Sequence, residues 1–274
     1  MSLTEPFPDL DEFLVAIGIA GQRLASIEAS EGAAGNISIL IGWPIEVRRR
    51  FPIAEPIELP LPAPALAGQT IIVSGSGRRL RDIHTDPAAN LAAIVIGTDG
   101  ITGTLHTSPR RLFERVTSEF NSHLAVHNDQ VTLFGTNFQA LIHAQPPNLV
   151  YLSHVPAYQD QTFMNKRIIR WEPETIVQLP EGLGVLPFLL PGSPAMMEGN
   201  VKLLREHQVV LWGKHGVMAR SDKSVTRAAD RIEYLETAAH YEYMDLVCGG
   251  KAEGLSVEQL QEVVRAFNVN TKLI

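Results

Sequence analysis

Short runs of β-branched and aliphatic residues recur along this chain, and they are separated by turns and by stretches with helical spacing. The clearest runs are ISILI at 37–41, TIIVS at 70–74, FQALIHA at 138–144 and QVVLW at 208–212. Runs of this length are typical of strands, whereas apolar residues three or four positions apart are typical of amphipathic helices. Loose alternation of the two favours one sheet covered by helices. We therefore predict an α/β fold in a single layered domain over residues 1–274.

Capping residues mark the expected starts of two helices. Asp9 or Asp11 is placed to cap a helix at residues 10–30, and Thr117 or Ser118 is placed to cap one at 117–129. The segment between them is different, because residues 51–69 hold many prolines. Proline lacks the backbone N–H that helices and central strands use, so we expect this segment to cross the surface irregularly.

Composition and charge exclude several classes of protein. With 45% hydrophobic and 19% charged residues among 274, the chain has the composition of a soluble globular protein with a sizeable core. A formal net charge of −7 argues against general nucleic-acid binding, which needs a basic face. The single cysteine, Cys248, excludes an intramolecular disulfide and a cysteine-based zinc cluster. Without a signal peptide or an apolar run near the roughly 20 residues of a membrane span, we expect a cytoplasmic protein with no membrane partner.

Two strand ends carry candidate metal ligands. Alternate residues of a strand share a face, so His143 and Gln145 can converge on one ion. Imidazole is a good ligand for zinc, whereas an amide oxygen is a weaker, neutral one. The alternative is that His143 satisfies a backbone carbonyl and Gln145 starts the turn into Pro146. His215 follows the apolar run at 208–212 and precedes a glycine, so it occupies the same kind of position.

Small and hydroxylated residues indicate a candidate anion site. Ser76 and Gly77 lie in a glycine turn that can aim backbone N–H groups at an anion, although a plain hairpin turn has the same composition. Thr117 and Ser118 would add hydroxyls at a helix N-terminus, where a phosphate is stabilised, or they simply cap the helix. Glu119 follows directly and is either a surface residue that stabilises the helix dipole or a general base.

Two histidines of the same predicted helix are interpreted more simply. His123 and His127 lie one and two turns beyond Glu119 and have the spacing of metal ligands. We interpret them as ordinary residues of the helix face.

Taken together, four segments resemble one known family. They are VSGSGRRLRDIHTDPAANLAAIVIGTDG, TSEFNSHLAVH, LPEGLGVLPFLLPG and LWGKHGV. In this order they resemble the L-rhamnulose-1-phosphate aldolases of the class II aldolase/adducin superfamily over most of the chain. The resemblance implies α/β subunits with a mostly antiparallel central β-sheet covered by helices. It also implies a homotetramer with the site between subunits.

The resemblance implies an activity and a set of site residues. Family members cleave L-rhamnulose 1-phosphate, or a similar ketose 1-phosphate, to dihydroxyacetone phosphate and L-lactaldehyde through a metal-stabilised enediolate. By resemblance, His143 and His215 bind zinc or another divalent metal and Glu119 is the acid/base residue. Glu174 corresponds to a second catalytic carboxylate, for which Glu172 competes. The implied phosphate site consists of Asn36, Ser76, Gly77, Thr117 and Ser118.

Two positions depart from the family pattern. Gln145 stands where the family has the second histidine of His-x-His, and Ala33 stands where it has an asparagine near the phosphate. Amide oxygen is a harder and weaker donor than imidazole, so we expect weaker metal binding with a shift away from zinc. His154 either substitutes for the missing imidazole or lies on a helix that faces elsewhere.

The expected activity is therefore that of a metal-dependent aldolase, a lyase, with Gln145 as a third metal ligand. One alternative is a catalytically impaired member that binds a phosphorylated ligand or serves in assembly. Another is a different reaction of the superfamily, such as epimerisation or dehydration.

Overall fold

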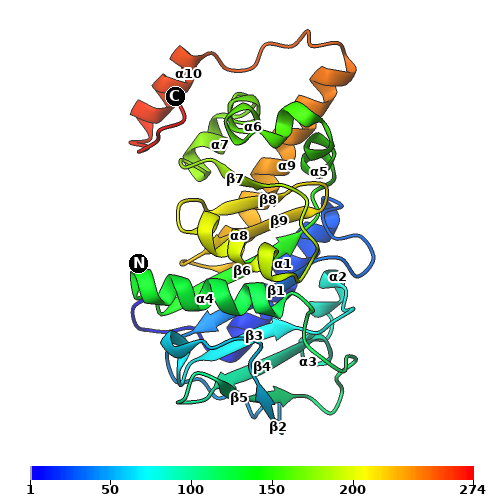
Figure 1. Cartoon of the computed structure of the whole chain (residues 1–274), viewed down its shortest axis with the longest axis vertical. Coiled ribbons are helices and arrows are strands. Elements are labelled where there is room, and N and C mark those ends of the chain that lie inside the picture. Colours follow the sequence, from blue (N-terminus) through cyan, green and yellow to red (C-terminus); the bar gives the residue numbers. More distant parts are fainter. Residues whose placement is uncertain (1) are drawn as a thin grey trace.

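The computed structural model describes residues 2–274, and within them nine strands form one sheet. The strand order is β2-β5-β4-β3-β1-β6-β9-β8-β7 (Figure 1). The strands are β1 (Asn36–Ile41), β2 (Ile53–Glu58), β3 (Thr70–Ser74), β4 (Leu91–Ile96), β5 (Thr102–Thr107), β6 (Phe138–Ala144), β7 (Leu183–Leu186), β8 (Val209–Trp212) and β9 (Gly216–Ser221). Between described strands every pairing is antiparallel except β7 with β8, which confirms the predicted mostly antiparallel sheet.

Helices cover both faces of this sheet. Figure 1 shows α4 and α8 in front of the strands, with α1 and α9 behind them. The α-helices are α1 (Leu10–Ser26), α2 (Leu80–Ile83), α3 (Pro87–Asn90), α4 (Phe120–Phe134), α5 (Pro147–His154), α6 (Gln161–Ile168), α7 (Pro173–Gln178), α8 (Pro194–Leu204), α9 (Val225–Val247) and α10 (Val257–Ala266), and the two short 3₁₀ helices are η1 (Pro64–Leu66) and η2 (Pro156–Gln159). The predicted α/β architecture of one sheet covered by helices is confirmed.

The proline-rich segment is more regular than its composition predicts. Residues 53–58 form β2, so the expectation of an irregular path is wrong there. β2 lies at one edge of the sheet and, among the described strands, pairs with β5 alone. An edge strand needs hydrogen bonds on one side only, which is why Pro56 is tolerated in it.

The two predicted helix starts have different outcomes. Asp9 caps α1, and its carboxylate accepts a hydrogen bond from the backbone N–H of Glu12 at 2.9 Å, as expected. α4 begins later than predicted, because its N-cap residue is Glu119 rather than Thr117 or Ser118. The Glu119 side chain makes no capping bond to the helix, so its carboxylate is available for other contacts.

Strand alternation divides the central strands into an apolar face and a mixed face. Ile37, Ile39 and Ile41 of β1 pack in the main core with α1, whereas Leu40 packs with Phe120 of α4. In the β1–β6 register Asn36 lies opposite His143, Ser38 opposite Leu141, and Leu40 opposite Gln139. Because alternate residues share a face, the polar residues of β1 and β6 point toward α4.

Some sequence-based expectations concern surroundings rather than fold. Between residues 2 and 274, none of the helices combines the length and apolar character that crossing a bilayer requires. Cys248 is a free, exposed thiol, consistent with the absence of an intramolecular disulfide.

Candidate active site

The carboxylate of Glu119 lies at the junction of α4 with the sheet. Its side chain is buried, with 5% of the residue exposed. Oε2 accepts a hydrogen bond of 2.7 Å from Nδ2 of Asn36, and it lies 3.8 Å from Nε2 of His143. A carboxylate buried without a cationic side chain is costly, so this position calls for a further positive partner. The surface role considered for Glu119 is therefore wrong.

His143, near the end of β6, is held in one orientation. Its Nδ1–H donates to the carbonyl oxygen of Val217 at 2.9 Å, and its ring stacks on Trp212 with centroids 4.5 Å apart. In the neutral ring, the proton on Nδ1 leaves Nε2 with a free lone pair that faces Glu119. A backbone carbonyl that fixes the tautomer in this way is usual for a metal-binding histidine.

His215 reaches the same place from the turn between β8 and β9. Its ring centroid lies 5.0 Å from that of His143. Burial lowers the pKa of His215 to about 4, with the charge of His143 as a smaller cause, so the ring is neutral near pH 7. Nδ1 of His215 is buried and has no hydrogen-bond partner among the described residues.

The turn that carries His215 depends on glycine. A β-carbon at Gly216 would lie 2.5 Å from the carbonyl oxygen of Ala144 and 2.8 Å from Cε1 of His143. Distances this short are not tolerated, so glycine is required for β9 to approach the end of β6. The absent side chain thereby lets the two histidines converge.

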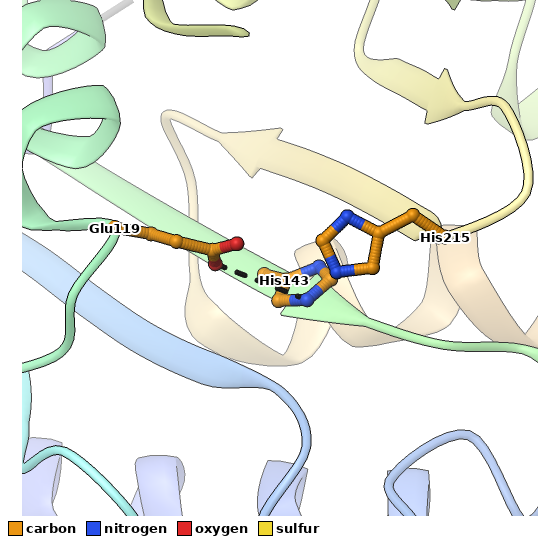
Figure 2. A group of neighbouring side chains, drawn as sticks. All are labelled: Glu119, His143 and His215. Atoms are coloured by element: carbon orange, nitrogen blue, oxygen red, sulfur yellow. Dashed lines mark ion pairs between the residues drawn. The ribbon is translucent and has the colours of Figure 1, made fainter. Parts of the chain in front are cut away.

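The three side chains form a candidate cation site by the chemistry of their donor atoms. One ligand atom from each of Glu119, His143 and His215 lies within 4.8 Å of the other two. Figure 2 shows His143 between the other two side chains, with Glu119 entering from α4 and His215 from the opposite side. With a neutral His143 ring protonated at Nδ1, Nε2 offers a lone pair on the side of Oε2 of Glu119, 3.8 Å away, so both atoms can bind one cation. The residues present therefore fit a divalent metal.

A cavity of about 680 Å³ opens beside this cluster. His215, Gln145 and His154 all line it, together with Arg81 and Tyr151. His154 is the last residue of α5, so the expectation that it lies on a helix is confirmed, but the helix brings it to the same cavity rather than elsewhere. A larger cavity of about 790 Å³, lined by residues 5–11 and parts of 43–50, contains no member of the cluster. The chemistry therefore points to the smaller cavity.

The predicted phosphate residues lie on two neighbouring segments. The backbone N–H of Ser76 donates to the carbonyl oxygen of Arg115 at 2.8 Å, and the backbone N–H of Thr117 donates to the carbonyl oxygen of Ser74 at 3.0 Å. These bonds bring the turn after β3 beside the start of α4. Ser76 is half-buried, and Gly77 and Ser118 are exposed. Gly77 has φ of +70°, a conformation that glycine adopts readily.

Asn36 is placed differently from its neighbours in the predicted phosphate site. It is buried at the start of β1, and both atoms of its side-chain amide are already hydrogen-bonded, to Glu119 and to His123. A role in phosphate binding stays a prediction.

The proposed second carboxylate lies apart from the cluster. Glu174 is exposed in the first turn of α7, and it does not line the 680 Å³ cavity. Glu172 is the N-cap residue of α7, and burial followed by the charge of Glu174 raises its pKa. The structure of one chain brings neither carboxylate into the group formed by Glu119 and the two histidines.

Comparison with known proteins gives the family. The model of the class II aldolase and adducin N-terminal domain matches residues 16–243, most of the chain. The chain belongs to the class II aldolase and adducin family. The family resemblance predicted from the sequence is thus confirmed.

Relatives and solved structures support the same assignment. Rhamnulose-1-phosphate aldolase of Yersinia pseudotuberculosis is 31% identical over 244 residues, which cover 87% of this chain and 87% of that protein. A sugar-phosphate aldolase from Thermotoga maritima has a similar structure, with a TM-score of 0.75, 25% identity, and coverage of 89% of this chain and 99% of that one. L-fuculose-1-phosphate aldolase from Thermus thermophilus, at 18% identity and a TM-score of 0.55, shares the fold; the match covers 89% of this chain and 100% of that one. Together they support a lyase of the aldolase type.

Two histidines of α4 have hydrogen-bond partners that the sequence did not reveal. His123 and His127 lie on α4 and outside the candidate metal cluster, as interpreted, but the sequence did not show that both are fully buried. Both rings bond the hydroxyl of Ser38 on β1, His123 through Nδ1 at 2.7 Å and His127 through Nε2 at 2.8 Å. His127 also contacts Oε1 of Gln139 on β6 at 2.7 Å. Their spacing of four residues was the available signal, but it suggested a metal site, and their partners come from the sheet.

Burial of His127 predicts a pH-dependent stability. Burial lowers its pKa from 6.5 in the unfolded chain to about 3 in the folded one. Between these values the unfolded chain binds a proton that the folded chain does not, so stability is lost as pH falls below about 6.5. The slope is about 1.4 kcal/mol per pH unit for this histidine. We expect His127→Gln to remove that slope in urea unfolding from pH 7 to 4.5 with chelator present. Parallel curves for variant and wild type would contradict this.

Proposed function

We propose that this chain is a metal-dependent aldolase that cleaves L-rhamnulose 1-phosphate, or a closely similar ketose 1-phosphate, to dihydroxyacetone phosphate and L-lactaldehyde. The observation that carries the proposal is the convergence of Glu119, His143 and His215 on one point beside a cavity. The 31% identity to a rhamnulose-1-phosphate aldolase supports the choice of sugar. The proposed unit is a single domain over residues 1–274, active as a homotetramer in the cytoplasm.

The metal in this proposal is zinc or another divalent ion, held by His143 and His215 with Gln145 as a weaker third ligand. When bound, the ion supplies Lewis-acid polarisation of the substrate's oxygens. His143 offers Nε2 because its Nδ1–H is engaged by Val217. Gln145 lines the cavity beside His215, which supports its place in the ligand set.

Glu119 is the proposed acid/base residue. Cleavage of the carbon–carbon bond releases a proton from the hydroxyl that becomes the aldehyde oxygen, and it leaves an enediolate that must gain a proton at carbon. A buried carboxylate next to the cluster can take up one proton and deliver it to that carbon, so protons balance over the reaction. Oε2 is fixed by Asn36, so the carboxylate has a defined direction. Glu174 is proposed to serve the departing aldehyde from a neighbouring subunit, because its exposed position on α7 suits contact between chains.

The substrate's phosphate is proposed to bind at the turn after β3 and the segment before α4, through Ser76, Gly77, Thr117 and Ser118, with Asn36 at the edge of this group. The backbone N–H groups of Ser76 and Thr117 are already bonded to Arg115 and Ser74, so the hydroxyls and the remaining N–H groups of this segment are the proposed phosphate donors. Binding at the phosphate orients the reacting carbons toward Glu119.

Gln145 offers a direct test of the metal site. We expect Gln145→His to lower the dissociation constant for zinc by about tenfold or more, a gain of about 1.4 kcal/mol, because imidazole is a better zinc ligand than an amide. Isothermal titration with zinc and with manganese measures this. His154→Gln, on the same cavity, is the matched control and should leave zinc affinity unchanged. Equal zinc affinity in Gln145→His and wild type would contradict a ligand role for residue 145.

The reaction is tested by product analysis with a panel of ketose 1-phosphates. L-rhamnulose 1-phosphate should give dihydroxyacetone phosphate and L-lactaldehyde in equal amounts, and faster than its stereoisomers. Formation of an epimer or a dehydrated sugar without dihydroxyacetone phosphate would instead identify another reaction of the family. Binding of a phosphorylated sugar with no turnover at saturating metal would identify an impaired member.

A further inference from the structure

A chain of five hydrogen bonds runs from Glu119 into the protein interior. Its members alternate between α4 and β1, and the last member lies on β6. All of its side chains are buried, with at most 7% of any residue exposed. We call this set the Glu119 relay; in order from Glu119 it consists of Asn36, His123, Ser38, His127 and Gln139.

The hydrogen atoms in the first part of the relay follow from the chemistry of its end. A carboxylate only accepts hydrogen bonds, so Nδ2 of Asn36 donates to Glu119 at 2.7 Å. Oδ1 of Asn36 then faces Nε2 of His123 at 2.5 Å. An amide oxygen also only accepts, so Nε2 of His123 must carry the proton. The ring has no anionic hydrogen-bond partner and burial lowers its pKa well below the usual range, so it is neutral and Nδ1 is an acceptor.

The same reasoning fixes the middle of the relay. The hydroxyl of Ser38 has a single hydrogen, which it must donate to Nδ1 of His123. Ser38 therefore accepts from His127, whose Nε2 must carry a proton. Burial keeps His127 neutral, so its Nδ1 is an acceptor too.

The last bond determines the orientation of Gln139. Oε1 of Gln139 lies 2.7 Å from Nδ1 of His127, and both atoms are acceptors. In the same orientation, Nε2 of Gln139 is buried and has no hydrogen-bond partner among the described residues. A half-turn of the amide removes the contact between two acceptors, because Nε2 then donates to His127. Gln139 lines a cavity of about 170 Å³, and Arg220 lines the same cavity.

We propose that the Glu119 relay is polarised, with every N–H or O–H group in it pointing toward Glu119, and that its members are positioning residues for the reaction. Its one contact with Glu119 is the amide of Asn36, which the rest of the relay prevents from turning over. An amide turned over would present oxygen to the carboxylate and push it away from His143. The catalytic consequence rests on the acid/base role proposed for Glu119, whereas the polarity rests on the hydrogen bonds alone.

The polarity is tested by ¹⁵N NMR of protein labelled at histidine. Protonated and bare ring nitrogens differ in chemical shift, and the signals are assigned from their loss in His123→Gln and in His127→Gln. We expect both rings at pH 7 to be neutral, with the proton on Nε2. A proton on Nδ1 of either ring, or an imidazolium, would overturn the proposal. The measurement needs no substrate, so it stands apart from the proposed function.

The positioning role is tested by paired variants at His123. Glutamine can place an amide N–H where Nε2 of the ring lies, whereas leucine fills the space without a donor. We expect His123→Leu to lower kcat by about tenfold to a hundredfold with KM within about twofold, because misplacing a catalytic group affects the chemical step. His123→Gln should keep at least about half of the wild-type kcat at similar melting temperature.

The outcomes against this role are equally defined. If both variants lose kcat equally, and in proportion to their loss of melting temperature, His123 has a structural role only. An unchanged kcat in His123→Leu would show the same. If His123→Leu does not fold, the ring tautomers measured by NMR in the wild type test the proposal instead. A wild type that cleaves no ketose 1-phosphate would contradict the proposed function and leave the polarity to the NMR result.

Discussion

Glu119→Gln is expected to lower kcat for cleavage of L-rhamnulose 1-phosphate by about 10²- to 10⁴-fold, the range of a lost general acid/base. Glutamine has nearly the same shape and can still accept the hydrogen bond from Asn36, so the site should keep its geometry. It cannot carry the proton that the enediolate carbon receives. Steady-state kinetics at saturating metal measures the change, and the metal content of the variant is determined in the same preparation.

Glu114→Gln is the matched control for this prediction. Glu114 is an exposed carboxylate five positions earlier, outside the cluster. It should retain wild-type kcat. If Glu119→Gln kept kcat within about tenfold of wild type, Glu119 would not be the acid/base residue.

His143→Asn is expected to abolish metal binding and to lower kcat by about 10³-fold or more, because the Lewis acid supplies several kcal/mol of stabilisation to the transition state. Asparagine can place its Nδ2–H near the position of the ring Nδ1, so the hydrogen bond to Val217 is preserved while the Nε2 ligand is lost. If His143→Asn loses metal with little loss of stability, the role of His143 as a metal ligand is distinguished from a role in folding. Metal analysis, kinetics and thermal unfolding of one sample give all three values.

His154→Asn is the control for the loss of a histidine from the same region. His154 lines the cavity but does not belong to the cluster. It should keep wild-type metal content. Full metal content in His143→Asn, or its loss in His154→Asn, would show that the ligand set is wrong.

Local sequence signals predicted the elements whose structure is decided locally. Asp9 caps α1 with a reciprocal bond to Glu12, three residues on, and that pattern is legible in the sequence. The start of α4 could not be predicted in this way. Thr117 and Ser118 are residue types that favour helix caps, but they belong to a segment that is hydrogen-bonded to Ser74 of β3. The strand at residues 53–58 was missed for a related reason. Its prolines argue against a central strand, and only the sheet order shows that β2 is an edge.

The cluster was predictable in part because both histidines lie at strand ends beside small residues. Their convergence, however, depends on β6 pairing with β9 and on the missing side chain of Gly216, neither of which periodicity reveals. Glu119 as acid/base residue came from the family resemblance, since a carboxylate in a first turn is usually a surface residue. Its burial results from the packing of α4 against β1.

The relay histidines show what sequence patterns miss. His123 and His127 have helical spacing, whereas their partners lie on two other elements: Ser38 lies 85 residues before His123, and Gln139 lies 12 residues after His127. Only the β1–β6 register places these polar side chains on the face that α4 covers. Without that register, the spacing of four residues indicates a shared helix face but not which partners the two histidines bind.

The most direct test of the proposed function joins metal content to catalysis in the unmodified chain. Protein purified without a tag is analysed for zinc, manganese and cobalt, stripped with chelator, and reloaded with each ion while release of dihydroxyacetone phosphate from L-rhamnulose 1-phosphate is followed. We predict one divalent ion per chain, with cleavage lost on stripping and restored in proportion to the ion rebound. Cleavage that persists in fully stripped protein, or one bound ion per chain with no cleavage, would contradict the proposed function.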